Sequence, residues 1–192
     1  METYQDLPVL FFEDMPAWNQ WLNVHHAEPS GVWLKFAKKA SGITSLTYQP
    51  ALEVALCYGW IDGQTKSLDE TYYLQKFTPR RPKSIWSKRN VGIAERLIAE
   101  GLMQPSGRAA IDAAKADGRW DQAYDSASNM AIPEDFQAAL NAHPKAKEFY
   151  ETLNKTNAYA ILWRIQTAKK PETRTARIEK LIVMLERGEK LH

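Results

Sequence analysis

The stretch that organises the chain occupies Ala51–Asn90 and reads ALEVALCYGWIDGQTKSLDETYYLQKFTPRRPKSIWSKRN. It begins with the apolar spacing of a helix, which Gly59 ends because glycine readily takes the left-handed conformation beyond a helix C-terminus. Residues 60–62 and 71–77 follow as strands, and Gly63 allows a bulge or a turn after the first of them. This order predicts a helix followed by two strands of a small sheet.

The segments on either side supply further elements. Upstream, residues 7–13 form an apolar run suited to a buried strand, and Asp14 is a good N-cap for a helix over Pro16–His25. At the end of the organising stretch, Ser84 or Ser87 is expected to cap another helix. The chain therefore mixes short strands with helices of two to four turns.

Residues 32–38 alternate in character, which predicts a half-buried strand. The even-numbered apolar positions of this strand are expected to face the core, and Trp33 is expected to lie on the opposite face. Further along, Ser106 is a candidate cap for a helix over residues 107–116.

The composition changes after this helix. Residues 119–133 are polar and small, as in a linker, and the remainder has helical spacing throughout. We therefore expect an α+β domain over residues 1–120, a linker over 121–133 and an all-helical C-terminal module over 134–192. The predicted fold class is α+β, with a small, mostly antiparallel sheet and packed helices.

Composition limits the classes of protein to be considered. The chain has 192 residues, a net charge of +2 and a single cysteine, Cys57, so an intrachain disulfide is excluded. The sequence shows no export signal and no apolar run that would span a membrane, so we expect a cytoplasmic protein. His25 and His26 are adjacent and diverge on a helix, and no phosphate-binding or dinucleotide-binding motif is present. We therefore expect neither a metal nor a cofactor.

The unusual chemistry lies at the basic end of the organising stretch. Residues 71–94 contain six Lys or Arg residues and no acidic residue. Arginines, serine hydroxyls and the N–H groups of a helix N-terminus together suit phosphate or carboxylate. The simpler alternative is that these charges solvate a loop and pair with acids elsewhere. The predicted ligand-binding residues are Trp60, Asp62, Arg80, Arg81, Ser84, Trp86, Ser87 and Asn90.

Two features leave other functions open. Asp62 precedes a glycine at a strand end, where a carboxylate can act as a general base or orient an arginine, although an Asx-turn or a salt bridge is the structural alternative. Aromatic residues interleaved with basic ones can also stack on nucleobases. Aromatic residues on short strands are more often part of the core, so nucleic acid is the least favoured partner.

The motifs CYGWIDG and LDETYYLQKFTPRRPKSIWSKRN resemble the signature of the YdeI/OmpD-associated family of bacteriocin-protection proteins. The C-terminal run that begins IPEDFQAALNAHPKAKEFYETLNKTNAYAILWRIQ is similar to the helical module of that family. The resemblance implies a role in bacterial envelope defence: tolerance of bacteriocins and cationic antimicrobial peptides, and association with outer-membrane porins. It implies no catalytic residues. The matched motif positions are Gly59, Trp60, Ile61, Asp62, Gly63, Pro79, Arg80, Ser84, Trp86, Ser87 and Asn90.

The leading hypothesis is a non-enzymatic stress-protection or envelope-defence protein that binds a small anionic ligand or a protein partner at residues 79–90. The first alternative is an enzyme that acts on a phosphorylated or carboxylated small molecule, with Asp62 as the general base. The second alternative is a nucleic-acid-binding protein.

Overall fold

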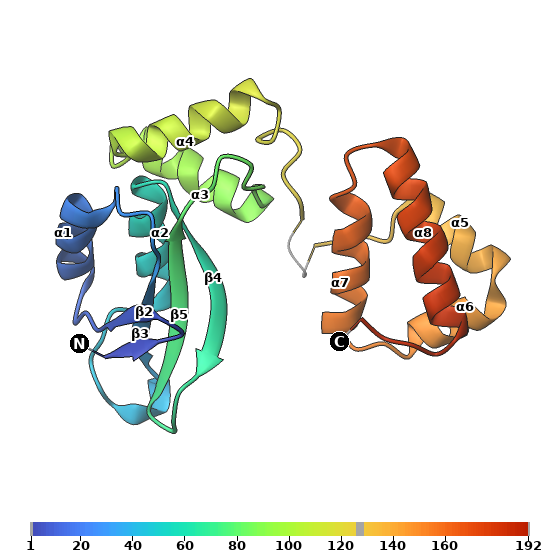
Figure 1. Cartoon of the computed structure of the whole chain (residues 1–192), viewed down its shortest axis with the longest axis horizontal. Coiled ribbons are helices and arrows are strands. Elements are labelled where there is room, and N and C mark those ends of the chain that lie inside the picture. The colour runs from blue at the N-terminus through green and yellow to red at the C-terminus, as the bar shows by residue number, and fades with distance from the viewer. Residues whose placement is uncertain (1, 126–128, 192) are drawn as a thin grey trace. The chain divides into compact units, whose positions relative to one another are not determined.

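The computed structural model describes residues 2–125 and 129–191. The chain folds into two compact units, and each is described here by itself (Figure 1). The first unit comprises Met1–Trp86 and Asn90–Gln122, and the second comprises Ser87–Arg89 and Ala123–His192. Within the linker predicted over 121–133, residues 126–128 lie outside the described residues.

The first unit is built on a five-stranded sheet with the strand order β1-β2-β3-β5-β4. Neighbouring strands run antiparallel except β2 and β3, which are parallel and are joined through helix α1. The predicted α+β class with a mostly antiparallel sheet is confirmed. The strands are β1 (Thr3–Tyr4), β2 (Leu7–Leu10), β3 (Val32–Ala37), β4 (Trp60–Ser67) and β5 (Tyr72–Pro79).

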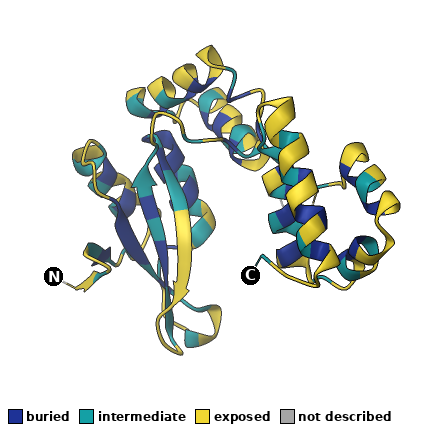
Figure 2. Cartoon of the chain, turned by 45° about the vertical axis from the view of Figure 1, so that its right-hand side comes forward, coloured by how far each residue is buried: buried dark blue, intermediate teal, exposed yellow. Residues whose placement is uncertain are grey.

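One face of the sheet is covered by α1 (Met15–His25) and α2 (Tyr48–Cys57). Asp14 caps α1 as predicted, because its carboxylate accepts a hydrogen bond from the Ala17 N–H at 2.9 Å. The fully buried Trp18 of α1 packs against strand residues, with its ring 5.9 Å from that of Phe77 and 6.4 Å from that of Trp60. Figure 2 shows that buried positions gather along the strands of this sheet.

The opposite face of the sheet also buries side chains, and Trp33 is among them. This side chain lies on the face away from α1 and α2, as its position in the strand requires, yet it is fully buried. It packs with Val9 and Leu74, and the ring of Tyr4 meets it edge-on at 5.2 Å. Strand alternation predicted the face correctly, and side chains of β1, β2 and β5 on this face form a second small core around Trp33.

Gly59 ends α2 and begins β4. Its φ of +78° lies in the left-handed region that favours glycine, and a Cβ there would approach the Ser106 carbonyl oxygen at 3.0 Å. In β4, the register against β5 shifts between Asp62 and Thr65, so of the bulge or turn predicted at Gly63 the structure has a bulge, and the strand continues to Ser67 instead of ending at residue 62.

A short 3₁₀ turn, η1 (Lys39–Ser41), follows β3, and α3 (Lys88–Ala99) and α4 (Pro105–Ala116) follow β5. Helix α4 packs closely on the end of α2, since a Cβ at Gly107 would lie 2.1 Å from the Cys57 carbonyl oxygen. The predicted cap at Ser106 is wrong. The helix starts one residue earlier, at Pro105, because proline is favoured in the first turn, and Gln104 is its N-cap residue.

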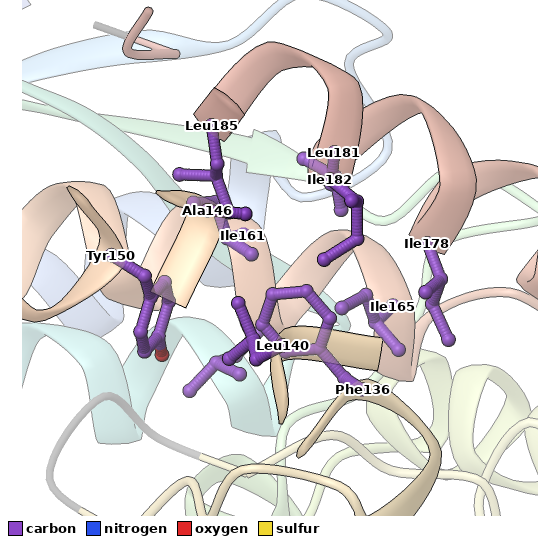
Figure 3. Packing of buried hydrophobic residues seen from close by; sticks show 11 residues of the cluster. Phe136, Leu140, Ala146, Tyr150, Ile161, Ile165, Ile178, Leu181, Ile182 and Leu185 are labelled. Carbon is purple, nitrogen blue, oxygen red and sulfur yellow. The ribbon is translucent and has the colours of Figure 1, made fainter. Parts of the chain in front are cut away.

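The second unit is helical and has its own core, which Figure 3 shows from close by. Its helices are α5 (Glu134–Ala142), α6 (Pro144–Glu151), α7 (Lys155–Gln166) and α8 (Pro171–Glu186). The buried residues of this core are Phe136, Leu140, Ala146, Tyr150, Ile161, Leu162, Ile165, Ile178, Leu181, Ile182 and Leu185. Among the described helices, none has the length and apolar character needed to cross a bilayer.

Candidate functional site

The basic segment leaves β5 in a tightly held turn. The Arg80 N–H donates to the Gly59 carbonyl at 2.9 Å, which ties the segment to the end of α2. The Ser84 N–H then donates to the Arg81 carbonyl at 2.8 Å. Pro79 and Pro82 restrict the backbone on both sides of the arginine pair. The two guanidinium groups therefore start from a defined backbone.

Arg80 is stacked on Trp86. The central guanidinium carbon lies 3.4 Å from the centroid of the indole ring, and Nη1 donates to the Ile85 carbonyl at 3.2 Å. Trp86 is only 2% exposed and packs against Trp120 with ring centroids 4.8 Å apart. A cation–π contact of this kind contributes about 2 kcal/mol when desolvated. The plane and the position of the Arg80 guanidinium are thereby set.

Arg119 completes this cluster, although its place in the sequence does not predict a site residue. The side chain is 7% exposed, and its Nε donates to the Asp117 carboxylate at 2.7 and 2.8 Å. Its Nη1 donates to the Ser84 carbonyl at 2.7 Å, across 35 positions of sequence. The local signal was weak, because an arginine just after a glycine-terminated helix is typical of a linker.

These side chains surround a small pocket, which we call the arginine pocket. Its volume is about 60 Å³ and no carboxylate lines it. Within residues 2–125 and 129–191, the exposed Arg81 side chain makes no hydrogen bond or ion pair, and the buried Trp86 Nε1 has no acceptor. The lining residues are Arg80, Arg81, Pro82, Trp86, Ala110, Ala113 and Arg119.

Five of the eight predicted site residues do not line the arginine pocket, namely Trp60, Asp62, Ser84, Ser87 and Asn90. Trp60 is fully buried in the core beneath the sheet, where its Nε1 donates to the His26 carbonyl at 2.8 Å. The Asp62 carboxylate accepts a hydrogen bond from the Tyr48 hydroxyl at 2.8 Å. Neither residue lines the arginine pocket.

The end of the basic segment, Ser87–Arg89, belongs to the second unit. Ser87 forms a parallel bridge with Tyr124, and the Lys88 ammonium pairs with Asp125 at 3.0 Å. Hydrogen bonds from Lys88 and then from Gln166 hold the pKa of the Asp125 carboxyl below its usual value. The alternative that basic residues pair with distant acids therefore holds for Lys88. Asn90, buried in α3, belongs to the first unit.

The chemistry of the arginine pocket favours binding of an oxyanion. Guanidinium groups and an indole N–H are all donors, and none of them can serve as a general base. Cys57 provides no nucleophile, because burial and then the nearby Glu53 carboxylate raise its pKa to about 11. The described ranges also contain no cluster of three or more His, Cys, Asp or Glu residues suited to a metal ion.

Two family models match the chain. One, described as "Domain of unknown function (DUF8412)", matches residues 10–110. The other, described as "Bacteriocin-protection, YdeI or OmpD-Associated", matches residues 129–188, which confirms the predicted family resemblance and indicates a bacteriocin-protection role at the family level. The organising stretch Ala51–Asn90 falls within the first match. A search of curated proteins and a search of solved structures found no match.

Proposed function

Because the chain belongs to the family described as "Domain of unknown function (DUF8412)" and carries a C-terminal bacteriocin-protection module, we propose that it is a bacterial envelope-defence protein that binds a small oxyanion in the arginine pocket. The ligand is a phosphate or carboxylate group, either free or displayed by a partner molecule. Binding, rather than chemical turnover, is the activity assigned to this pocket.

The observation that supports this proposal is the convergence of three guanidinium groups in one pocket. Arg80, Arg81 and Arg119 come from two separate parts of the chain and line the same space, and no acidic residue is among the residues that line it. Arg80 and Arg119 are held in place by Trp86 and Asp117, respectively. Charge-assisted hydrogen bonds from such pre-oriented donors are the strong ones in proteins.

The unmatched indole N–H adds an independent argument. A buried donor without an acceptor costs about 1–3 kcal/mol, and within the described residues Trp86 Nε1 is such a donor. An oxyanion or an ordered water in the pocket would supply the acceptor. The pocket is therefore lined by positive charge and by a residue with unsatisfied hydrogen-bonding capacity.

The size of the pocket favours a binding role over an enzymatic one. Its volume of about 60 Å³ accommodates one oxyanion group, whereas pockets that enclose a whole small molecule measure about 300–1,000 Å³. The alternative with Asp62 as a general base gains no support, because Asp62 does not line this pocket and is bonded to Tyr48. The alternative of a nucleic-acid-binding protein gains no support from Trp86, because its buried ring is not available to stack on a base.

The test is calorimetric titration of the full chain with inorganic phosphate. Arg81→Ala removes a charge-assisted donor that is exposed in the protein, so we expect binding to weaken by about tenfold or more. Arg108→Ala is the matched control, because Arg108 is an exposed arginine of the same unit outside the pocket. If both variants bind phosphate as wild type does, the arginine pocket is not the site.

A second arm tests the biological role. A bacterial strain that lacks this protein is complemented with wild type, Arg81→Ala or Arg108→Ala and is exposed to a bacteriocin. We expect wild type and Arg108→Ala to restore survival, and Arg81→Ala to restore less. Equal survival with and without the protein would contradict the envelope-defence role independently of the phosphate result.

A further inference from the structure

The second unit contains a larger pocket, bordered by α7 and α8, which we call the α7–α8 pocket. Its volume is about 430 Å³, within the range of pockets that hold small molecules. It lies inside the helical module and shares no residue with the arginine pocket. The lining residues are Trp163, Arg164, Thr167, Arg177, Lys180, Leu181, Met184 and Leu191.

The lining has an apolar part and a cationic part. Four of the eight residues are apolar or aromatic, three are cationic and none is acidic. The apolar group combines one aromatic ring and flexible aliphatic side chains, including Met184, whose unbranched thioether adapts to ligands of irregular shape. A ligand that fills this pocket must therefore carry apolar surface.

The three cations are not equivalent. Arg177 is held in place, because its Nη1 donates to the Arg164 carbonyl at 2.5 Å and lies 3.4 Å from the Thr167 hydroxyl. The Arg164 and Lys180 side chains are exposed, and in the part of the chain that the structure describes they make no hydrogen bond or ion pair. Two charged groups at the pocket are thus available to a ligand.

From this combination we propose that the α7–α8 pocket binds an anionic amphiphile: a single acyl chain with a carboxylate or phosphate head. The chain occupies the apolar lining formed by Trp163, Leu181 and Met184, and the head accepts hydrogen bonds from Arg164 and Lys180. An anion without an acyl chain would leave the apolar lining exposed to water. An uncharged acyl chain would leave the cations of the pocket without an anionic partner. Only a molecule with both parts matches the pocket.

The first experiment is a calorimetric titration of the full chain with decanoate, kept below its micelle concentration. Decanol serves as the neutral chain of the same length, and inorganic phosphate as the anion without a chain. We expect decanoate to bind at least about tenfold more tightly than decanol, since the head interacts with charged donors. Decanol binding as tightly as decanoate would overturn the assignment of the head group.

The variants locate the site. Arg164→Gln/Lys180→Gln should weaken decanoate binding by about tenfold or more, and both positions are exposed, so the fold is expected to persist. Lys155→Gln/Arg187→Gln is the matched control, because it removes two exposed cations at the ends of the same helices, outside the pocket. Equal loss in both double variants, or loss in neither, would show that the pocket does not bind the ligand.

Arg81→Ala separates this inference from the arginine pocket. It should leave decanoate binding unchanged while phosphate binding falls, because no residue is shared between the two pockets. Loss of decanoate binding in this variant would instead place the amphiphile at the arginine pocket and overturn the inference.

A last arm identifies the source of the amphiphile. Vesicles of phosphatidylglycerol are compared with vesicles of phosphatidylcholine in a sedimentation assay with wild type and Arg164→Gln/Lys180→Gln. Sedimentation with the anionic vesicles alone, lost in the double variant, indicates a membrane lipid. Decanoate binding without vesicle sedimentation indicates a free acid. If the protein binds neither decanoate nor anionic vesicles, the inference is overturned.

Discussion

The two pockets differ in how many of their three cations are held in place. In the arginine pocket, Arg80 is stacked on Trp86 and Arg119 is paired with Asp117, so two of the three donors are fixed around about 60 Å³. In the α7–α8 pocket, the exposed Arg164 and Lys180 border about 430 Å³ of largely apolar space. Fixed donors around a small space select ligands by geometry. Exposed donors beside an apolar surface select ligands by their amphipathic character.

The hydrophobic cores of the two units also differ in the kind of side chain that they contain. The first unit buries large rings on both faces of its sheet, including Trp18, Trp33, Trp60 and Trp86. The second unit packs mainly isoleucine and leucine between helices (Figure 3). The indole N–H groups of Trp18 and Trp60 donate to backbone carbonyls and fix the orientation of these rings, whereas aliphatic side chains repack more easily. The contrast predicts that changes in one core leave the other intact.

The largest expected effect comes from Trp60→Ala. This change leaves a cavity beneath the sheet and removes the hydrogen bond to the His26 carbonyl, so we expect a loss of about 3–5 kcal/mol in the free energy of unfolding of the first unit. Hydrogen exchange followed by mass spectrometry should show faster exchange in β4 and β5. Exchange in α7 and α8 should match wild type.

Ile161→Ala is the reciprocal variant, because Ile161 is fully buried in the helical core. It should cost about 2–5 kcal/mol and accelerate exchange in α7 and α8 only. If either variant accelerated hydrogen exchange in both units, the two units would unfold as one cooperative structure, and their cores would not be independent.

A glycine pair within the first unit gives an intermediate effect. Gly107→Ala places a Cβ 2.1 Å from the Cys57 carbonyl oxygen, and the overpacking should destabilise by about 1–3 kcal/mol. Gly92→Ala is the control: Gly92 lies inside α3 with no atom within 4 Å of the new Cβ, so alanine should stabilise by about 0.5–1 kcal/mol. Urea denaturation measures both. Effects of the same sign would contradict the close approach of α4 to α2.

The smallest effect concerns an ion pair in the second unit. Arg174 donates to both carboxylate oxygens of Asp135, at 2.6 and 2.9 Å, and holds the pKa of that carboxyl below its usual value of 3.8. A carboxyl with a lowered folded-state pKa stabilises the fold above the unfolded-state pKa, and this contribution disappears as pH falls through the folded-state pKa. The carboxylate is half-exposed, so the contribution is at most about 1 kcal/mol.

Asp135→Asn measures this contribution. Thermal denaturation should show wild type more stable than the variant at pH 6, with the difference shrinking below pH 3.8. A difference that stays constant down to the lowest pH would mean that the ion pair is not its source.

The sequence by itself determined the local structure. The Asp14 cap, the end of α2 at Gly59 and a bulge or turn at Gly63 were all predicted, because each depends on the backbone preferences of one residue and its near neighbours. Strand alternation likewise placed Trp33 on the correct face of β3. Arg80, Arg81 and Trp86, which line the arginine pocket, were predicted as site residues from the absence of acids around them.

Only the tertiary structure decided which side chains cover each face of the sheet and which charged side chains come together in a pocket. Trp33 is buried because side chains of neighbouring strands cover it on its face of the sheet, and Arg119 joins the arginine pocket through a hydrogen bond to Ser84 across 35 positions. Trp60 and Asp62, close to the arginines in sequence, take hydrogen-bonding partners elsewhere. Such contacts depend on how distant segments pack together, so nearest-neighbour chemistry predicts the elements of this protein but not the composition of its pockets.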